Sequence, residues 1–307
     1  YFHAGDTYEV QDLDLENNKA ILKFSQNEDY FTEPLNSMKI DLIKLLSSET
    51  MNAGHRRYGE IEVISKVTGY KIRDWRTKAV SSINPLDMPE TALNTTGCWF
   101  SICNQIIENL KRKGFWNDDQ QDYGRDWPKL RKRILDRDNH TCQHCGMQED
   151  IIPFHVHHLI PIRNFDDVMV ANKIDNLVTL CPECHKQAEM TVKIRSSLAG
   201  LGYAFQHIAS LLLMCDVNDI GKYHEVNSKL ADGDPIILLY DQVSGGIGLS
   251  KTIYDLYDDL FIKTYELISQ CICEDGCPSC IGASSDFSQG SKVMVLELLR
   301  ELIGTNA

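Results

Sequence analysis

Two short stretches decide the fold of the central part of the chain: CQHC at residues 142–145 and VHHLIPIRNFDDVMVANKIDNLVTLCPECH at residues 156–185. Each stretch holds two cysteines that are separated by two residues. Two such turns bring four thiolates together, and four thiolates suit a tetrahedral structural zinc ion. The alternation in residues 154–161 indicates an extended segment between the turns. We therefore predict a small unit held together by zinc, with these ligands: Cys142, Cys145, Cys181 and Cys184.

A second run of cysteines, CICEDGCPSC at residues 271–280, places four thiols close together in the sequence. Gly276 and Pro278 supply the turns that such a compact loop needs. We expect another structural zinc ion here, and an iron–sulfur cluster, which also binds to four cysteines, is the alternative. The expected ligands are Cys271, Cys273, Cys277 and Cys280.

The composition is that of a globular chain. The 307 residues correspond to about two or three domains, and 43% of them are hydrophobic, which is enough to bury a core. The formal net charge of −13 argues against a surface that binds polyanions generally. Residues 125–137 form a local basic run, which is typical either of a solvated helix face or of a surface that contacts phosphates. The DNA contacts expected from this run are Lys129, Arg131, Lys132 and Arg133.

The sequence contains no run of about 18 apolar residues, and its start lacks the basic and apolar regions of a signal peptide. We therefore expect no membrane segment and a cytoplasmic location. The first residue is Tyr1 rather than methionine, so we also expect the chain to be a piece of a longer protein.

Local patterns predict the elements outside the central unit. A hairpin in residues 5–33 and later strand-like segments indicate a β-rich unit. A helix is expected at about 97–111, a polar linker at 113–126, and a helix that begins at Asp126 and ends near Asp136. Beyond residue 197 the expected elements are a helix over 198–214, a buried strand over 236–240, a glycine turn over 244–248 and helices over 251–270 and 292–303.

The strings VHHLIPI…DNLVTLCPECH and RKRILDRDNHTCQHCG resemble the HNH endonucleases, which are ββα-metal nucleases, over about residues 125–192. The resemblance implies that His158 is the general base and that Asn176 braces the loop of the site. It also implies that His157 and His185 bind a catalytic divalent ion. Where many members have another histidine, this chain has Glu189, which would be either an oxygen ligand for Mg²⁺ or Mn²⁺ or a solvated helix residue.

These residue types suit phosphodiester hydrolysis. Imidazole titrates near neutral pH, so His158 can take a proton from water. A divalent cation stabilises the charge that develops on the leaving oxygen. Adjacent residues of a strand face opposite sides, so we expect an irregular strand end at His157 and His158. We expect His144 and His155 to be structural rather than metal ligands.

The flanking sequences resemble a second family. The strings LDMPETALNTTGCWF, LGYAFQHIASLLLMCDVNDIG, YDQVSGGIGLSKTIYD and CICEDGCPSCIG are similar to the MrfA-type zinc-binding domain. That domain lies at the C-terminal end of bacterial superfamily-2 DEAD/DEAH helicases and also occurs in phage-defence proteins. The N-terminal string YFHAGDTYEVQDLDLENNKAILKF is similar to the β-rich segment that precedes it. The resemblance implies a bacterial source, and it implies two partners, DNA and a superfamily-2 helicase region of the same or another polypeptide.

Together the patterns predict an α+β protein of three parts. These parts are a small β-rich unit at 1–83, a mixed α/β zinc-binding domain made of 84–112 and 197–307, and an inserted zinc-stapled ββα-metal (HNH) module at 113–196. The expected function is metal-dependent hydrolysis of DNA phosphodiester bonds by a helicase-associated, phage-defence protein. The alternative is a non-catalytic zinc-stapled module that binds DNA or a partner. The expected cofactors are two structural zinc ions and one catalytic Mg²⁺ or Mn²⁺.

Overall fold

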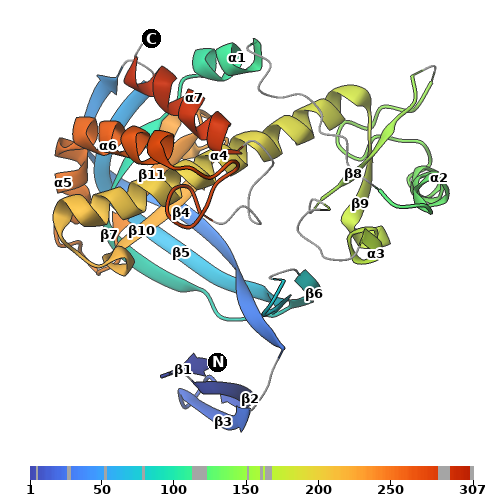
Figure 1. Cartoon of the computed structure of the whole chain (residues 1–307), viewed down its shortest axis with the longest axis horizontal. Helices are drawn as coiled ribbons and strands as arrows, with labels where there is room; N and C mark the ends of the chain where they lie inside the picture. The colour runs from blue at the N-terminus through green and yellow to red at the C-terminus, as the bar shows by residue number, and fades with distance from the viewer. Residues whose placement is uncertain are drawn as a thin grey trace.

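The computed structural model describes residues 1–4, 6–25, 29–51, 54–77, 80–112, 123–150, 152–159, 162, 168–282 and 291–304. Most of the expected linker at 113–126 therefore lies outside the described residues. Figure 1 shows three parts: a small sheet at the N-terminus, a large sheet covered by helices, and a smaller unit at the far end of a long helix. No described helix is both long and apolar enough to cross a membrane.

The N-terminal part is an antiparallel sheet of β1 (Phe2–His3), β2 (Asp6–Asp14) and β3 (Lys19–Ser25), in that order. The β2–β3 hairpin confirms the hairpin expected here, and its turn places Asn18 in the left-handed region, at a φ of 52°. Asparagine tolerates this conformation better than most residues. Most side chains of this sheet are exposed.

The central sheet has six antiparallel strands. Its order is β10-β11-β7-β5-β4, and β6 also pairs with β5. The longest pair joins β4 to β5 from Tyr30↔Asp74 to Met51↔Gly54. The strands are β4 (Tyr30–Met51), β5 (Gly54–Asp74), β6 (Val80–Pro85), β7 (Thr91–Ser101), β10 (Ile220–Glu225) and β11 (Ile236–Asp241).

Residues 97–101 correct one sequence prediction. They belong to strand β7, and helix α1 (Asn104–Arg112) begins only after them. The strand lies between β5 and β11, and both Cys98 and Trp99 are fully buried. A strand covered on both faces has a continuous apolar sequence, and its periodicity does not distinguish it from a helix.

Helices cover one face of the central sheet (Figure 1). Phe100 of β7 packs edge-on against Phe205 of α4 and Phe261 of α6, with ring centroids 5.8 and 5.1 Å away. On the other face of the sheet, Trp99 packs with a separate apolar cluster and donates a hydrogen bond to the Leu230 carbonyl. The helices are α4 (Pro182–Leu213), α5 (Leu249–Asp255), α6 (Tyr257–Gln270) and α7 (Ser291–Ile303).

The backbone N–H groups of the glycine turn before α5 bind the carboxylate of Asp241. Asp241, which is fully buried, accepts hydrogen bonds from the backbone N–H groups of four consecutive residues, Ile247 to Ser250. A carboxylate is favoured at a helix N-terminus because the free N–H groups there point at it. The turn is therefore closed by an internal anion, which supports the prediction that its glycines serve turn geometry.

Helix α4 crosses the expected junction between the inserted module and the zinc-binding domain. The sequence predicts that the module ends at residue 196 and that a new helix begins at 198, whereas one helix runs from Pro182 to Leu213. The small unit consists of the start of this helix together with α2 (Trp127–Arg137), β8 (His155–His158), α3 (Val168–Ala171), a 3-10 turn (Ile174–Asn176) and β9 (Leu177–Leu180). Its core is distinct from the clusters of the central sheet and contains Ile134, Leu135, Phe154, Val156, Leu177 and Leu180.

Candidate active site and metal centres

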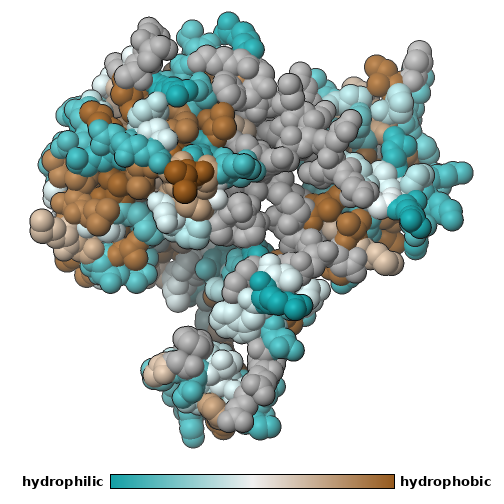
Figure 2. Space-filling model, viewed as in Figure 1, coloured by the Kyte–Doolittle hydropathy of each residue, from teal (hydrophilic) through white to brown (hydrophobic). Residues whose placement is uncertain are grey.

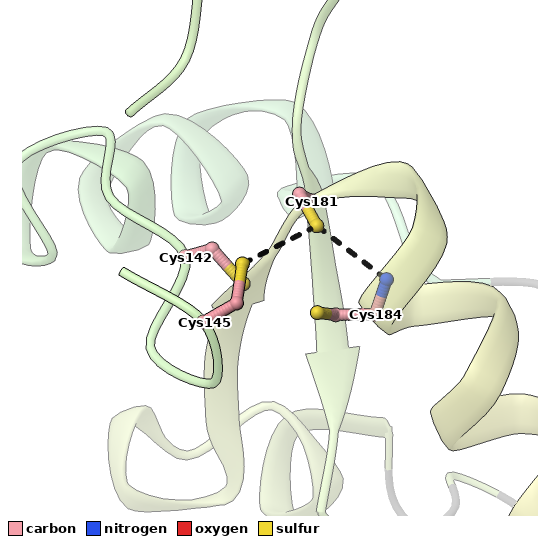
Figure 3. A group of neighbouring side chains, drawn as sticks. All are labelled: Cys142, Cys145, Cys181 and Cys184. Atoms are coloured by element: carbon pink, nitrogen blue, oxygen red, sulfur yellow. Dashed lines mark hydrogen bonds between the residues drawn. The ribbon is translucent and has the colours of Figure 1, made fainter. Parts of the chain in front are cut away.

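The first group of cysteines forms a compact donor set in the small unit. All four sulfur atoms lie within 4.8 Å of one another, and the Cys145 and Cys181 sulfurs are 3.8 Å apart. Figure 3 shows the four side chains converging from a loop and from the start of α4. Zn–S bonds of about 2.3 Å in a tetrahedron require sulfurs about 3.8 Å apart. The donor set therefore fits a structural zinc ion, as predicted from the spacing.

Backbone N–H groups donate hydrogen bonds to these sulfurs and favour the thiolate form, which binds a cation. Cys181 is the N-cap of α4, and its sulfur accepts a hydrogen bond from Cys184 N. Burial raises the pKa of the Cys142 thiol, but backbone N–H groups of Cys145, Cys181 and His144 lower it to a net value of about 6. Burial and the neighbouring sulfurs raise the pKa of Cys184. After one thiol ionises, its negative charge disfavours ionisation of the others at this distance. A bound dication would offset that repulsion.

The second group of cysteines is equally compact. Sulfur–sulfur distances of 3.5 to 3.6 Å connect Cys271, Cys273, Cys277 and Cys280. Lys292 of α7 is buried, and its ammonium donates to the carbonyls of Cys271 and Cys273, the latter at 2.7 Å. The lysine places a positive charge beside a site that would hold four thiolates. This donor set also fits zinc.

The histidines of the HNH motif lie on the short hairpin of β8 and β9 and on α4. His157 and His158 pair with Val178 and Leu177, so the ladder continues to the end of β8. The expected irregularity at this strand end is therefore absent from the ladder. The ring of His157 meets the ring of His185 nearly perpendicularly, with centroids 5.4 Å apart. The structure thus brings the two expected ligands of the catalytic ion together.

His158 faces a different set of neighbours. Its ring stacks near Trp127 and Tyr123, with centroids 5.2 and 5.8 Å away. Its Nε2 lies 2.8 Å from Oδ1 of Asn172, and Asn172 Nδ2 donates to the Tyr123 carbonyl. Only 6% of His158 is exposed. Strand alternation therefore separates His158 from the His157–His185 pair.

Asn176, the middle residue of the motif, forms hydrogen bonds with the backbone of two neighbouring segments. Its amide donates to the Ala171 carbonyl at 2.9 Å, and its own carbonyl accepts from Leu159 N at 2.9 Å. The first bond closes the end of α3, and the second fixes the residue that follows His158. Asn176 therefore contacts the segments on both sides of the site, and its bracing role stays a prediction.

The remaining expected site residues are Glu189 and the basic residues of α2. The side chain of Glu189 lies outside the described residues. Arg131 donates to the Phe154 carbonyl and therefore supports the fold. The remaining expected DNA contacts, Lys129, Lys132 and Arg133, are exposed on α2, and Figure 2 shows a hydrophilic surface over this helix. His144 Nδ1 lies 3.5 Å from the Cys184 sulfur, which suits a hydrogen bond to a thiolate.

Sequence reasoning missed several residues around the site. Asn172 and the aromatic rings of Tyr123 and Trp127 surround His158, and Lys292 contacts the second cysteine loop. Asn172 is 14 residues from His158, and Lys292 is 21 residues from Cys271. None of them has a spacing that links it to the group it contacts. The polar Asn172 within an otherwise apolar stretch, VMVAN, was the one available signal.

Two family models match the chain. The model "MrfA Zn-binding domain" matches residues 201–281, and the model "HNH endonuclease" matches residues 142–190. The chain contains both domains. The HNH domain includes the first cysteine group and the three motif histidines, and the MrfA Zn-binding domain includes the second cysteine group up to Cys280.

Two helicases match nearly the whole chain. The "Uncharacterized ATP-dependent helicase YprA" of Bacillus subtilis is 21% identical over 302 residues, which are 98% of this chain and 29% of that helicase. The crystal structure of the DUF1998 helicase MrfA bound to DNA matches with a TM-score of 0.50 and 21% identity, over 98% of this chain and 29% of that one. This chain therefore spans less than a third of these relatives and shares the fold of one region of MrfA.

Shorter relatives match part of the chain. The "Uncharacterized protein MJ1572.1" of Methanocaldococcus jannaschii is 33% identical over 85 residues, which are 26% of this chain and 76% of that protein. The "Probable HNH endonuclease" of Lactococcus phage SK1 is 28% identical over 83 residues, which are 26% of this chain and 81% of that protein.

Proposed function

We propose that the chain is a metal-dependent endonuclease that hydrolyses DNA phosphodiester bonds. The observation that carries the proposal is the contact between His157 of β8 and His185 of α4, the pair expected to hold the catalytic ion, with His158, the expected base, next to His157 in the same strand. Hydrolysis of a phosphodiester needs a base for water and a cation for the leaving oxygen, and the two groups supply one of each.

In this proposal His158 takes a proton from a water molecule as the water oxygen bonds to phosphorus. The bond from phosphorus to the 3′ oxygen breaks, and this oxygen takes a proton from solvent water. The products carry a 5′-phosphate and a 3′-hydroxyl. His157 and His185 would hold a divalent ion, Mg²⁺ or Mn²⁺, that stabilises the charge on the leaving oxygen. Two imidazoles with further positions left for oxygen donors suit such an ion, and Glu189 is the proposed third ligand.

The DNA would reach the site along the exposed side of α2. Lys129, Lys132 and Arg133 are exposed there, and Trp127 of the same helix stacks on His158. Lysine and arginine contacts to phosphates position a duplex without reading its sequence. We propose that the MrfA Zn-binding domain connects this HNH domain to a helicase region that supplies the DNA.

A non-catalytic module that binds DNA or a partner is the second candidate. It is favoured by the low exposure of His158, 6%, and by the packing of its ring against two aromatic side chains. In that case the zinc ions would stabilise a binding surface, and no bond would be cut.

Nicking of a supercoiled plasmid distinguishes the two candidates. The assay is run at low salt with Mg²⁺, Mn²⁺ or EDTA, and it compares the wild type with His158→Ala. We expect metal-dependent nicking that falls by at least about 100-fold in the variant, since a general base contributes about 10²–10⁴-fold. Both proteins should contain two zinc ions, which shows that the substitution left the folds intact. Equal nicking by both zinc-replete proteins would refute the role of His158.

A further inference from the structure

We propose that Asn172 is a positioning residue for the base. Its side chain holds neutral His158 in the tautomer that carries the proton on Nε2, so that the lone pair is on Nδ1. The consequence for catalysis rests on the proposed nuclease function, whereas the tautomer itself does not.

The orientation of the Asn172 amide follows from its second partner. One end of the amide lies 3.0 Å from the carbonyl oxygen of Tyr123, and a carbonyl oxygen can only accept a hydrogen bond. The NH₂ group must therefore face Tyr123. The oxygen of the amide is left to face His158, which agrees with the 2.8 Å separation between Oδ1 and Nε2.

The tautomer of His158 follows from the orientation of that amide. An amide oxygen accepts and cannot donate, so Nε2 of His158 must carry a hydrogen for the bond to form. A neutral imidazole has one protonated nitrogen, and the other nitrogen, here Nδ1, keeps the lone pair. A base can take a proton only through that lone pair, so the contact with Asn172 selects the reactive atom.

The backbone around Asn172 is itself held in place. Asn172 N donates to the carbonyl of Val168, the first residue of α3, and the side chain of Asn176 donates to the carbonyl of Ala171, the residue just before Asn172. Asn176 also accepts from Leu159 N, directly after His158. One asparagine thus ties together the segment that carries the base and the segment that carries its hydrogen-bond acceptor.

The stacked rings restrict the remaining freedom of His158. Trp127 and Tyr123 lie nearly parallel to the imidazole, at interplanar angles of 19° and 22°. Parallel neighbours permit the ring to lie in one plane but do not choose between its two nitrogens. The hydrogen bond to the Asn172 oxygen distinguishes the two nitrogens, because it favours the tautomer with the proton on Nε2.

The ¹⁵N NMR spectrum of the histidine side chains tests this assignment without any need for activity. Protonated and unprotonated ring nitrogens have well-separated shifts, and the signals of His158 are those lost in His158→Gln. The zinc-loaded chain is measured as wild type, Asn172→Leu, Asn172→Asp and Asp175→Asn. Asp175 is exposed and lies in the same 3-10 turn as Asn176, so its isosteric substitution is the matched control.

We expect a proton on Nε2 of His158 in the wild type and in Asp175→Asn. Asn172→Leu should lose this preference because it removes the acceptor. Asn172→Asp should keep a proton on Nε2 because a carboxylate still accepts there, while it loses the hydrogen bond to the Tyr123 carbonyl. In single-turnover cleavage, Asn172→Leu should be about 100-fold slower while its DNA affinity stays within about two-fold, because only the base is affected.

Two results would overturn the assignment: a proton on Nδ1 in the wild type, or an unchanged tautomer in Asn172→Leu. A third result would distinguish the tautomer assignment from the nuclease proposal. If the tautomer shifts as expected in Asn172→Leu but the wild type cuts no DNA, the role of Asn172 in orienting His158 stands and the nuclease function falls.

Discussion

Individual residues on β8 acquire different surroundings because successive side chains of a strand point to opposite faces. His155 and His157 share the face that meets α4, and the ring of His155 stacks on the ring of His185 with centroids 4.6 Å apart. His158 lies on the other face, beside α2. His155 is exposed, whereas His157 is 8% exposed, so burial separates the expected ligand from its neighbour.

Metal activation tests the role of individual histidines. We expect His157→Ala and His185→Ala to raise the Mn²⁺ or Mg²⁺ concentration needed for half-maximal nicking by more than about 100-fold. Loss of a residue that only hydrogen-bonds a metal ligand typically costs roughly 10- to 100-fold, and loss of a ligand should cost more. His155→Ala is the matched control and should change it by less than about ten-fold, since His155 is stacked on a ligand rather than being one. An equal rise in all three variants would mean that the face as a whole, and not the predicted pair, holds the ion.

The titration of His224 in β10 makes part of the stability depend on pH. Burial, together with the positive charges of Arg195 and Lys222, lowers the pKa of His224 to about 4. A histidine in the unfolded chain has a pKa of about 6.5, so between these values the unfolded state binds the additional proton. Stability should therefore be complete above pH 6.5 and should fall as the pH drops toward 4.

Urea unfolding at several pH values checks this prediction. Between pH 7 and pH 4 the wild type should lose roughly 3 kcal/mol more free energy of unfolding than His224→Gln, which cannot be protonated in this range. Loss of zinc in acid affects both proteins alike, so the difference between them isolates the histidine. Parallel pH profiles for the two proteins would contradict the prediction.

At the scale of elements, α4 contacts both cysteine groups. Its N-cap, Cys181, belongs to the first cysteine group. Further along the helix, Tyr203 donates a 2.7 Å hydrogen bond to the carbonyl of Pro278 in the second cysteine loop. Gly200 lies close by, and a Cβ at this position would lie 3.2 Å from Val295 and 3.3 Å from Ile281. A side chain at position 200 would therefore require Val295 and Ile281 to shift slightly.

Two glycines of α4 provide a matched pair of substitutions. A Cβ at Gly202 would meet only Ile237, at an ordinary 3.6 Å. Gly202→Ala should therefore raise the free energy of unfolding by up to about 1 kcal/mol, the helix-propensity difference between the two residues. Gly200→Ala should lack this gain or lower the stability, because Val295 and Ile281 must shift. Chemical denaturation measures both, and equal gains would contradict the packing argument.

The whole molecule combines units whose apolar cores are separate. The cluster around Ile134 and Phe154 in the HNH domain shares no residue with the clusters on the two faces of the central sheet. Each unit of this kind also has its own cysteine group. A small domain with a limited core depends strongly on its metal.

Loss of one zinc ion should therefore unfold one unit. Cys184→Ser should lower the zinc content from two ions to one and expose the HNH domain to proteolysis, while the central sheet stays protected. Cys277→Ser should lose the other ion and loosen the MrfA Zn-binding domain. Cys215→Ser is the control, since Cys215 belongs to neither cysteine group, and it should keep both ions. Metal analysis with limited proteolysis measures this, and global unfolding in Cys184→Ser would contradict independence of the units.

Local patterns were sufficient where the chemistry is local. The two CxxC pairs and the run from Cys271 to Cys280 predicted both compact donor sets, because ligand spacing determines how a short loop can surround a metal. The α+β class and the hairpin of β2 and β3 were also predicted correctly. Residues 97–101 were not, because burial on both faces of a strand removes the alternation from which strands are recognised.

The sequence by itself therefore determined which residues can bind metal and in what order the motif residues occur. The tertiary structure alone decided which side of β8 each histidine faces, that Asn172 contacts His158, that Lys292 contacts the second cysteine loop, and that α4 continues across the expected junction. Ligand spacing is a property of a few neighbouring residues. A hydrogen bond between residues 14 or 21 positions apart depends on how separate elements pack, and no local pattern encodes that packing.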